Sequence, residues 1–188
     1  MQMCAFGDYR YRKIKDLENH MGARITNVLI TFDTESILND YKNLSRDPKN
    51  PTAISAKYIY MVTNGANAIS GQAGGELNLK ASVNDVIRWR EATLTLSSDD
   101  SALMYAFVPT GGANLISPPQ ALLSTVTVPV PNPGNLTTPN FETIKDFFWN
   151  SIALDTGRVT YHFHFMITDR YGQVKGYCKW DPYITISN

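Results

Sequence analysis

The sequence predicts an all-β fold, an antiparallel β-sandwich of the jelly-roll type with one main helix. Two observations support this prediction. Strand patterns recur at short spacing between turn residues, and apolar residues alternate with polar ones in the closing segments at 158–170 and 174–187. Such alternation buries one face of a strand and leaves the other in water, which is typical of antiparallel sheets.

The other predicted strands follow shorter patterns of the same kind. In residues 25–34, alternate apolar residues share one face. The strand at 124–131 contains prolines, which cannot donate a hydrogen bond to a neighbouring strand, so we expect it at a sheet edge. Residues 101–109 are apolar on both faces, so we expect that strand at the centre of a sheet. Further strands are predicted at 57–63, 76–83 and 85–96.

The main helix is predicted at about residues 139–149. Apolar residues recur there at intervals of three or four, and Thr138 and Pro139 suit the N-cap and the first turn. A shorter helical pattern covers residues 36–44 and predicts a turn or two of helix.

Residues 85–96 change their pattern partway along the strand. Apolar residues occupy odd-numbered positions up to Trp89 and even-numbered positions from Ala92 onward. Because successive side chains of a strand point to opposite faces, a regular strand cannot bury both sets in one core. We therefore predict a β-bulge at Arg90–Glu91, which either re-aims side chains toward a functional site or only lets the strand follow the curvature of the sandwich.

The charge balance argues against several kinds of partner. Lysine plus arginine equals aspartate plus glutamate at 17 each, so the formal net charge is zero. A neutral chain has no global attraction to nucleic acid or to an anionic membrane, and copies of it repel one another little. We expect neither nucleic acid nor membrane as a partner, and the composition favours self-association.

The simplest organisation for 188 residues is one domain, which we place at residues 24–188. Residues 1–23 are charge-rich and weakly periodic, so we expect a flexible N-terminal extension there, with Met21 as an alternative start. No continuous apolar stretch follows the basic residues of this segment, as a secretory signal would require, so we expect a cytoplasmic protein.

The candidate metal ligands are His162 and His164, two positions apart on one predicted strand face. Two histidines at this spacing can share a metal ion, and Met166 on the same face would suit copper. Cys178 is predicted to point inward, away from both histidines, so ordinary polar side chains on an exposed face are the favoured interpretation. We predict no metal site and no cofactor.

No residue pattern indicates catalysis. Asp33 and Glu35 at a strand end have no evident partner for acid–base chemistry, and a Gly-x-Ser-x-Gly elbow is absent from the sequence. The glycine-rich segment at 70–76 lacks the Lys-Ser/Thr pair of a phosphate-binding P-loop. We therefore predict that the protein is not an enzyme.

A site for a sugar or another small polar ligand is the alternative that the residues leave open. The last strand pattern turns a row of tyrosine, lysine and aspartate outward, which suits either a polar ligand or an ordinary strand surface. We expect such a site at strand ends and at the predicted bulge, although Trp180 fits the core better. The candidate ligand-binding residues are Asp33, Arg88, Arg90, Glu91, Trp180 and Asp181.

Several segments together resemble the AidA/PixA family of bacterial inclusion-body proteins. They are residues 33–38, 45–55, 58–62, 70–91, 115–119, 126–135 and 157–186. The resemblance implies a small cytoplasmic protein with a β-sandwich core that accumulates at high cell density, in some relatives as inclusions. It also implies control by quorum sensing and links to host colonisation or virulence in some relatives, and it brings no catalytic residues with it.

The leading prediction is a non-enzymatic protein of the AidA/PixA type that associates with itself, with a homodimer as its basic unit and inclusion bodies as its location. The alternative prediction is a lectin-like β-sandwich module that binds carbohydrate or another small polar ligand.

Overall fold

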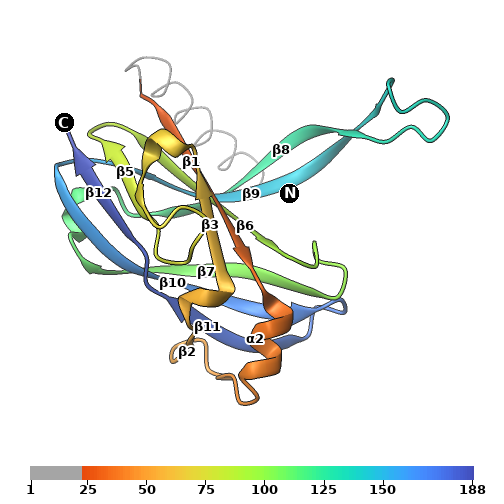
Figure 1. Ribbon diagram of the computed structural model, residues 1–188, viewed down its shortest axis with the longest axis horizontal. Helices are drawn as coiled ribbons and strands as arrows, with labels where there is room; N and C mark the ends of the chain where they lie inside the picture. Colours follow the sequence, from red (N-terminus) through yellow and green to blue (C-terminus); the bar gives the residue numbers. More distant parts are fainter. Residues whose placement is uncertain (1–22) are drawn as a thin grey trace, which may run out of the picture.

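Two β-sheets pack face to face in the computed structural model, which describes residues 23–188 (Figure 1). The β-sandwich predicted from the sequence is confirmed. The predicted extension at residues 1–23, apart from Ala23, lies outside the described residues, as do the alternative start at Met21 and Cys4.

The strand order is β3-β1-β6-β9-β8 in the first sheet and β2-β11-β10-β12-β5-β4 in the second, where β7 also pairs with β10. The first sheet consists of β3 (Ile59–Thr63), β1 (Ile25–Phe32), β6 (Val86–Thr93), β9 (Asn140–Ile152) and β8 (Gln120–Val130). The second consists of β2 (Thr52–Ala53), β11 (Val174–Trp180), β10 (Gly157–Asp169), β12 (Tyr183–Ser187), β5 (Asn78–Ser82), β4 (Ala68–Ser70) and β7 (Asp100–Gly111). Both sheets are mixed rather than purely antiparallel, because β1–β6, β2–β11 and β5–β12 run parallel.

Short helices fill some of the connections. Helix α2 (Thr34–Asp40) overlaps the helical pattern predicted at 36–44, and Asp33 caps it by accepting a hydrogen bond from the Ser36 N–H at 3.0 Å. Within residues 23–188, no helix is both long and apolar enough to cross a membrane. The 3₁₀ turns are η1 (Ala56–Tyr58), η2 (Gly65–Asn67) and η3 (Ala113–Leu115).

Strand β10 supplies the centre of the core. The ring of Phe163 stacks on Trp180, with centroids 5.7 Å apart, and meets the edge of Trp89 from β6 at 5.6 Å. Phe32 of β1 stacks on Phe165 at 4.2 Å, so rings from both sheets interlock. The inward residues of β10 are those predicted from its alternation: Val159, Tyr161, Phe163, Phe165 and Ile167, all buried.

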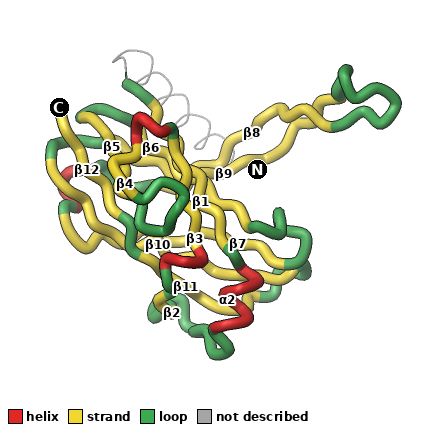
Figure 2. The backbone as a smooth tube through the Cα atoms, in the orientation of Figure 1, coloured by secondary structure: helices red, strands yellow, loops and turns green. Residues whose placement is uncertain are grey.

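The β8–β9 hairpin extends away from the sandwich as an arm (Figures 1 and 2). Only the residues 149–152 of β9 pair with β6, whereas β8 pairs with β9 along its whole length. We define the arm as Leu122–Val130 and Asn140–Phe148 with their connecting loop. In the described part of the chain, no third strand pairs with it. Strand β8 ends the first sheet, which confirms the edge position predicted for residues 124–131.

The main helix predicted at about 139–149 is wrong, because these residues belong to strand β9. The apolar residues at helical spacing divide between the two faces of the arm. Phe141 lies opposite Pro129 on one face, and Ile144 lies opposite Val126 on the other. Aromatic and β-branched residues favour strands, and each gains a cross-strand partner from β8, so tertiary pairing overrides the helical periodicity.

The β-bulge predicted at Arg90–Glu91 is also wrong. Strand β6 pairs with β1 in unbroken register from Val86 to Thr93. The strand ends there, and Leu94 and Leu96 of the second apolar set are exposed in the following turn rather than buried.

A bulge occurs instead on β7, which has an extra residue, Tyr105, relative to β10. The prediction that residues 101–109 form a central strand is wrong, because β7 pairs only with β10 among the described strands. The first sheet covers the inward side chains of β7, with the Phe107 ring 6.0 Å from the ring of Trp89. Its apolar residues therefore indicate contact between the sheets rather than a second neighbouring strand.

Replacing Phe163 with alanine should lower the free energy of unfolding by about 3–5 kcal/mol, because it leaves a cavity among the rings of both sheets. Denaturant titration followed by tryptophan fluorescence measures the loss. Phe141→Ala is the matched control, since it removes the same atoms from a side chain that is 67% exposed. The control should lose less than about 1 kcal/mol, and equal losses would contradict the core position of Phe163.

Candidate functional site

Three of the candidate residues lie in three separate places. Asp33 caps helix α2, and its carboxylate is engaged with the first turn of that helix. Trp180 is 2% exposed and packs against Phe163, so it belongs to the core and has no surface to offer a ligand. Asp181 is exposed in the turn between β11 and β12.

Arg88 and Arg90 lie on the outer face of the first sheet, where they cover Phe148. Their guanidinium carbons are 5.0 Å and 4.7 Å from the centroid of that ring. Arg90 also forms an ion pair with Asp146, with 3.0 Å between Nη2 and Oδ2, and Arg88 Nε donates to Asn150 Oδ1 at 3.4 Å. This cluster joins the base of the arm to β6.

Glu91 points the other way, into the space between the two sheets. Its Oε1 accepts a hydrogen bond from the backbone N–H of Met104 at 3.2 Å, while Trp149 Nε1 donates to the Met104 carbonyl at 3.3 Å. Glu91 and Trp149 belong to the first sheet and Met104 to edge strand β7 of the second. These side chains therefore tie the two sheets together by hydrogen bonds as well as by packing.

The Glu91 carboxyl is only half satisfied. Its Oε2 is buried and has no hydrogen-bond partner among the described residues. Burial raises the pKa of this carboxyl to about 7, and the nearby charge of Asp146 adds to the rise, although the backbone N–H of Met104 opposes it. Glu91 therefore changes its charge near neutral pH, at the point where the sheets meet.

A polar pocket of about 380 Å³ lies beside the paired strands β10 and β12. Asp181 and Glu76 bring carboxylates to it, and Arg158 and His162 bring nitrogen donors. The Arg158 guanidinium lies 4.0 Å over the ring of Tyr183, so one face of this ring is already covered. The pocket combines hydrogen-bond acceptors and donors, which suits a small polar ligand. Of the candidate ligand-binding residues, only Asp181 lines it.

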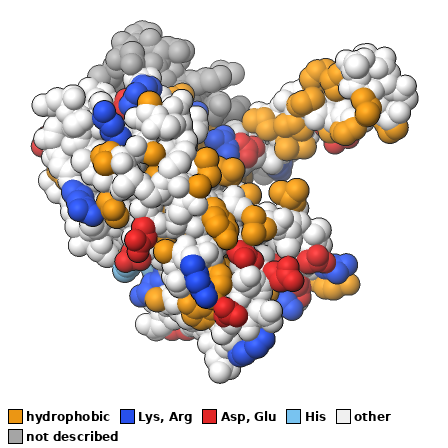
Figure 3. Space-filling model, in the orientation of Figure 1, with side chains coloured by type: hydrophobic (Ala, Val, Ile, Leu, Met, Phe, Trp, Pro, Cys, Tyr) orange, Lys and Arg blue, Asp and Glu red, His pale blue; other side chains and the backbone are white. Residues whose placement is uncertain are grey.

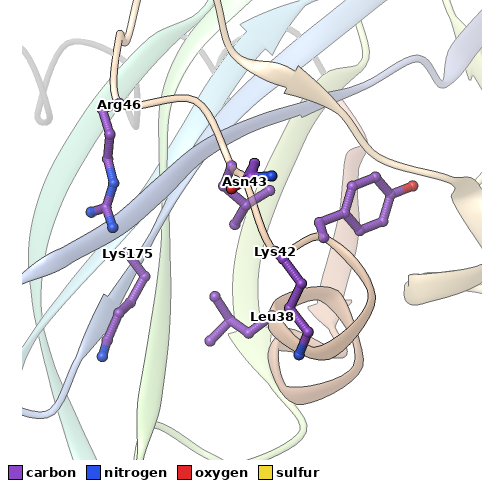
Figure 4. A pocket seen from close by; sticks show the side chains of 7 residues that line it. Leu38, Lys42, Asn43, Arg46 and Lys175 are labelled. Carbon is purple, nitrogen blue, oxygen red and sulfur yellow. The ribbon is translucent and has the colours of Figure 1, made fainter.

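A basic pocket of about 400 Å³ lies between helix α2 and the start of β11 (Figure 4). Lys42, Arg46 and Lys175 line it, and the amines of the two lysines extend in the same direction. Arg46 donates to the carbonyl of Val174, and Lys175 Nζ lies 3.6 Å from the Asp169 carboxylate. This pocket could not be predicted from the sequence, because the fold joins segments that lie far apart in the chain.

The two candidate metal ligands lie side by side on β10 with little else around them to bind a metal. The rings of His162 and His164 are 6.5 Å apart, and burial, with the charge of Lys179, lowers the pKa of His164. Cys178 is buried, which confirms its predicted inward direction. In residues 23–188, no three His, Cys, Asp or Glu side chains form a cluster that could hold a metal ion.

The two packed sheets, the pockets on their surface and the exposed hairpin define the chain as a single β-sandwich module. The family model described as "PixA: Inclusion body protein" matches residues 24–186. The chain therefore belongs to the PixA family of inclusion body proteins, which confirms the resemblance noted from its segments.

The sandwich also resembles a solved structure of the same family. That structure is an inclusion body protein from Burkholderia cenocepacia J2315, matched with a TM-score of 0.71 and 23% sequence identity. The match covers 88% of this chain and 97% of that one, so it extends over nearly the whole fold. A comparison with curated proteins finds no match.

Glu91→Gln should change how stability depends on pH. The carboxyl has a pKa of about 7 in the folded protein against an ordinary 4.5, so the folded state binds the proton more tightly. Its stabilising contribution is complete at low pH and is lost as the pH rises through 7, a loss on the order of 3 kcal/mol. Glutamine stays neutral and keeps an acceptor for Met104, so the variant should not show this loss.

Denaturant titrations of both proteins across the acid-to-alkaline range measure this difference. Above pH 7 the variant should be the more stable protein, and the advantage should shrink toward acid. Glu35→Gln, at an exposed position, serves as the control and should keep the pH profile of the unmodified protein. Parallel profiles for Glu91→Gln and the unmodified protein would show that Glu91 is not the titrating group.

Proposed function

We propose that this protein is a non-enzymatic, cytoplasmic bacterial protein whose copies associate with one another and accumulate in inclusions. The observation that carries the proposal is the arm. Leu123, Phe141 and Ile144 are 76%, 67% and 42% exposed on it, and Figure 3 shows hydrophobic side chains along its length. Membership of an inclusion-body family supports the same conclusion.

Exposed apolar surface of this kind indicates a binding partner. Monomeric soluble proteins rarely expose large contiguous apolar patches, and burying such surface contributes roughly 25 cal/mol per Å². The formal net charge of zero leaves little repulsion between copies. Association between copies rises with protein concentration by mass action. The proposal includes accumulation at high cell density, as the resemblance to the family implies, and such accumulation would favour association.

Light scattering across a concentration series tests self-association. The weight-average mass should rise from that of one chain toward that of a dimer or a larger assembly as the concentration increases. Added salt should have little effect, because the driving force is apolar burial between copies of a neutral chain. A mass that stays at one chain up to the highest soluble concentration would overturn the proposal.

The polar pocket favours a second candidate function, lectin-like binding of a carbohydrate or another small polar ligand. The carboxylates of Asp181 and Glu76 would accept hydrogen bonds from hydroxyl groups, and Arg158 would donate to ligand oxygens.

A glycan array tests this candidate. A sugar bound by the unmodified protein should bind Asp181→Ala at least ten-fold more weakly, because that change removes an acceptor from the pocket. Asp155→Ala is the matched control, since this exposed aspartate is not among the residues that line the pocket, and it should bind like the unmodified protein. No binding across broad sugar classes, or equal weakening by both variants, would count against the pocket.

A further inference from the structure

The outer face of the first sheet continues onto one face of the arm. Leu29 of β1 lies beside Val62 on one side and Arg90 on the other. Arg90 covers Phe148 of β9, and alternate residues lead from there along the same face to Ile144. We call this surface the clasp face. Its body end consists of Leu29, Tyr60 and Val62, and its arm end of Val126, Val128 and Ile144.

Apolar side chains predominate at both ends of the clasp face, with Glu142 opposite Val128 at the arm end, and its middle is charged. At the body end, Leu29, Tyr60 and Val62 are 45%, 36% and 40% exposed. Figure 3 shows hydrophobic side chains on the sandwich beside the base of the arm as well as on the arm itself. Between the two ends, Arg90 and Asp146 form an ion pair, and Arg88 lies beside them over Phe148.

This order of apolar, charged and apolar regions is self-complementary. A two-fold axis through the charged middle would place the arm end of each copy on the body end of the other, and the same residues would make both contacts. The chain thus supplies both halves of one interface. Near the axis, Arg90 of each copy would lie close to Asp146 of the other copy. This attraction favours the alignment.

The faces of the arm offer a partner more surface than its β8 edge. A two-stranded ribbon is marginally stable in water unless a further element packs on it. Pairing of another strand along the free edge of β8 is hindered at Pro129, which has no N–H to donate. The edge of β9 at 140–148 stays open, and a partner that packs on one face of the arm would stabilise both strands at once.

We propose that two copies of the chain clasp each other through this face, so that each arm lies across the β1–β3 side of the other copy's first sheet. This inference rests on the proposed self-association and specifies the geometry of one contact in it, because Leu123 and Phe141 lie on the opposite face of the arm. The proposal makes the basic unit a symmetric dimer.

The available area fits a stable dimer. Nine paired residues in each arm strand make a ribbon about 30 Å long and about 10 Å wide, so one face offers roughly 300 Å². Two such arms, each covering an equal area of the other copy, would bury roughly 1,200 Å² in all. That is at the lower end of the range for specific interfaces.

A cysteine pair in the full-length chain tests the clasp. In a Cys4→Ser background, Ile144→Cys combined with Val62→Cys should give a covalent dimer on mild oxidation, seen on a non-reducing gel. Within one copy these positions are separated by three strand spacings, roughly 14 Å, which is too far for a disulfide. The matched control pairs Val62→Cys with Thr143→Cys, the neighbouring exposed position on the opposite face of the arm.

Ile144→Asp gives an independent measurement by light scattering. It should weaken association at least ten-fold, whereas Thr143→Asp should leave it within about two-fold, and unchanged melting temperatures would show that both variants fold. If both cysteine pairs cross-link equally, or if neither does while light scattering still reports association, the clasp is overturned and self-association stands. If the unmodified protein stays monomeric at all concentrations, both proposals fail.

Discussion

The packing of aromatic rings along β10 is the constraint on which the rest of the molecule depends. This strand places Tyr161, Phe163 and Phe165 at successive inward positions, and each meets a ring from another strand. Trp89 of the first sheet meets Phe163 edge-on, so the distance between the sheets is set by ring dimensions. The strands that pair with β10 are therefore held at a fixed distance from the first sheet, and their outward side chains form the surface.

Because large side chains fill the core, the polar groups of the sandwich lie at its margins. The clearest case is Met104, whose backbone N–H and carbonyl both bond to side chains of the first sheet, Glu91 and Trp149. An edge strand with free backbone groups invites pairing with another chain, and these side chains block that edge at one point. The same arrangement buries the Glu91 carboxyl, and this burial raises its pKa to about 7.

Burial is predicted most accurately from the sequence where one face of a strand is buried and the other is exposed to solvent. The residues of β10 alternate without interruption, so their burial could be predicted residue by residue. The strand structure of the arm could not be predicted, because Phe141, Ile144 and Phe148 fit a helical period equally well. Only pairing with β8 decides between helix and strand. The same holds for Glu91, whose partner is a backbone N–H of the other sheet. Lys42 and Lys175 come together only because the fold joins α2 to β11.

Strand β12 has a consequence for how the chain is made. It is the last strand in the sequence, yet it lies inside the second sheet between β10 and β5. Ile184 pairs with Val159 on one side and with Leu79 on the other. The sheet cannot close until residues 183–187 have left the ribosome, and every shorter nascent chain exposes two unpaired strand edges. Long-range pairings of this kind fold slowly, and unpaired strand edges make incomplete chains prone to aggregate.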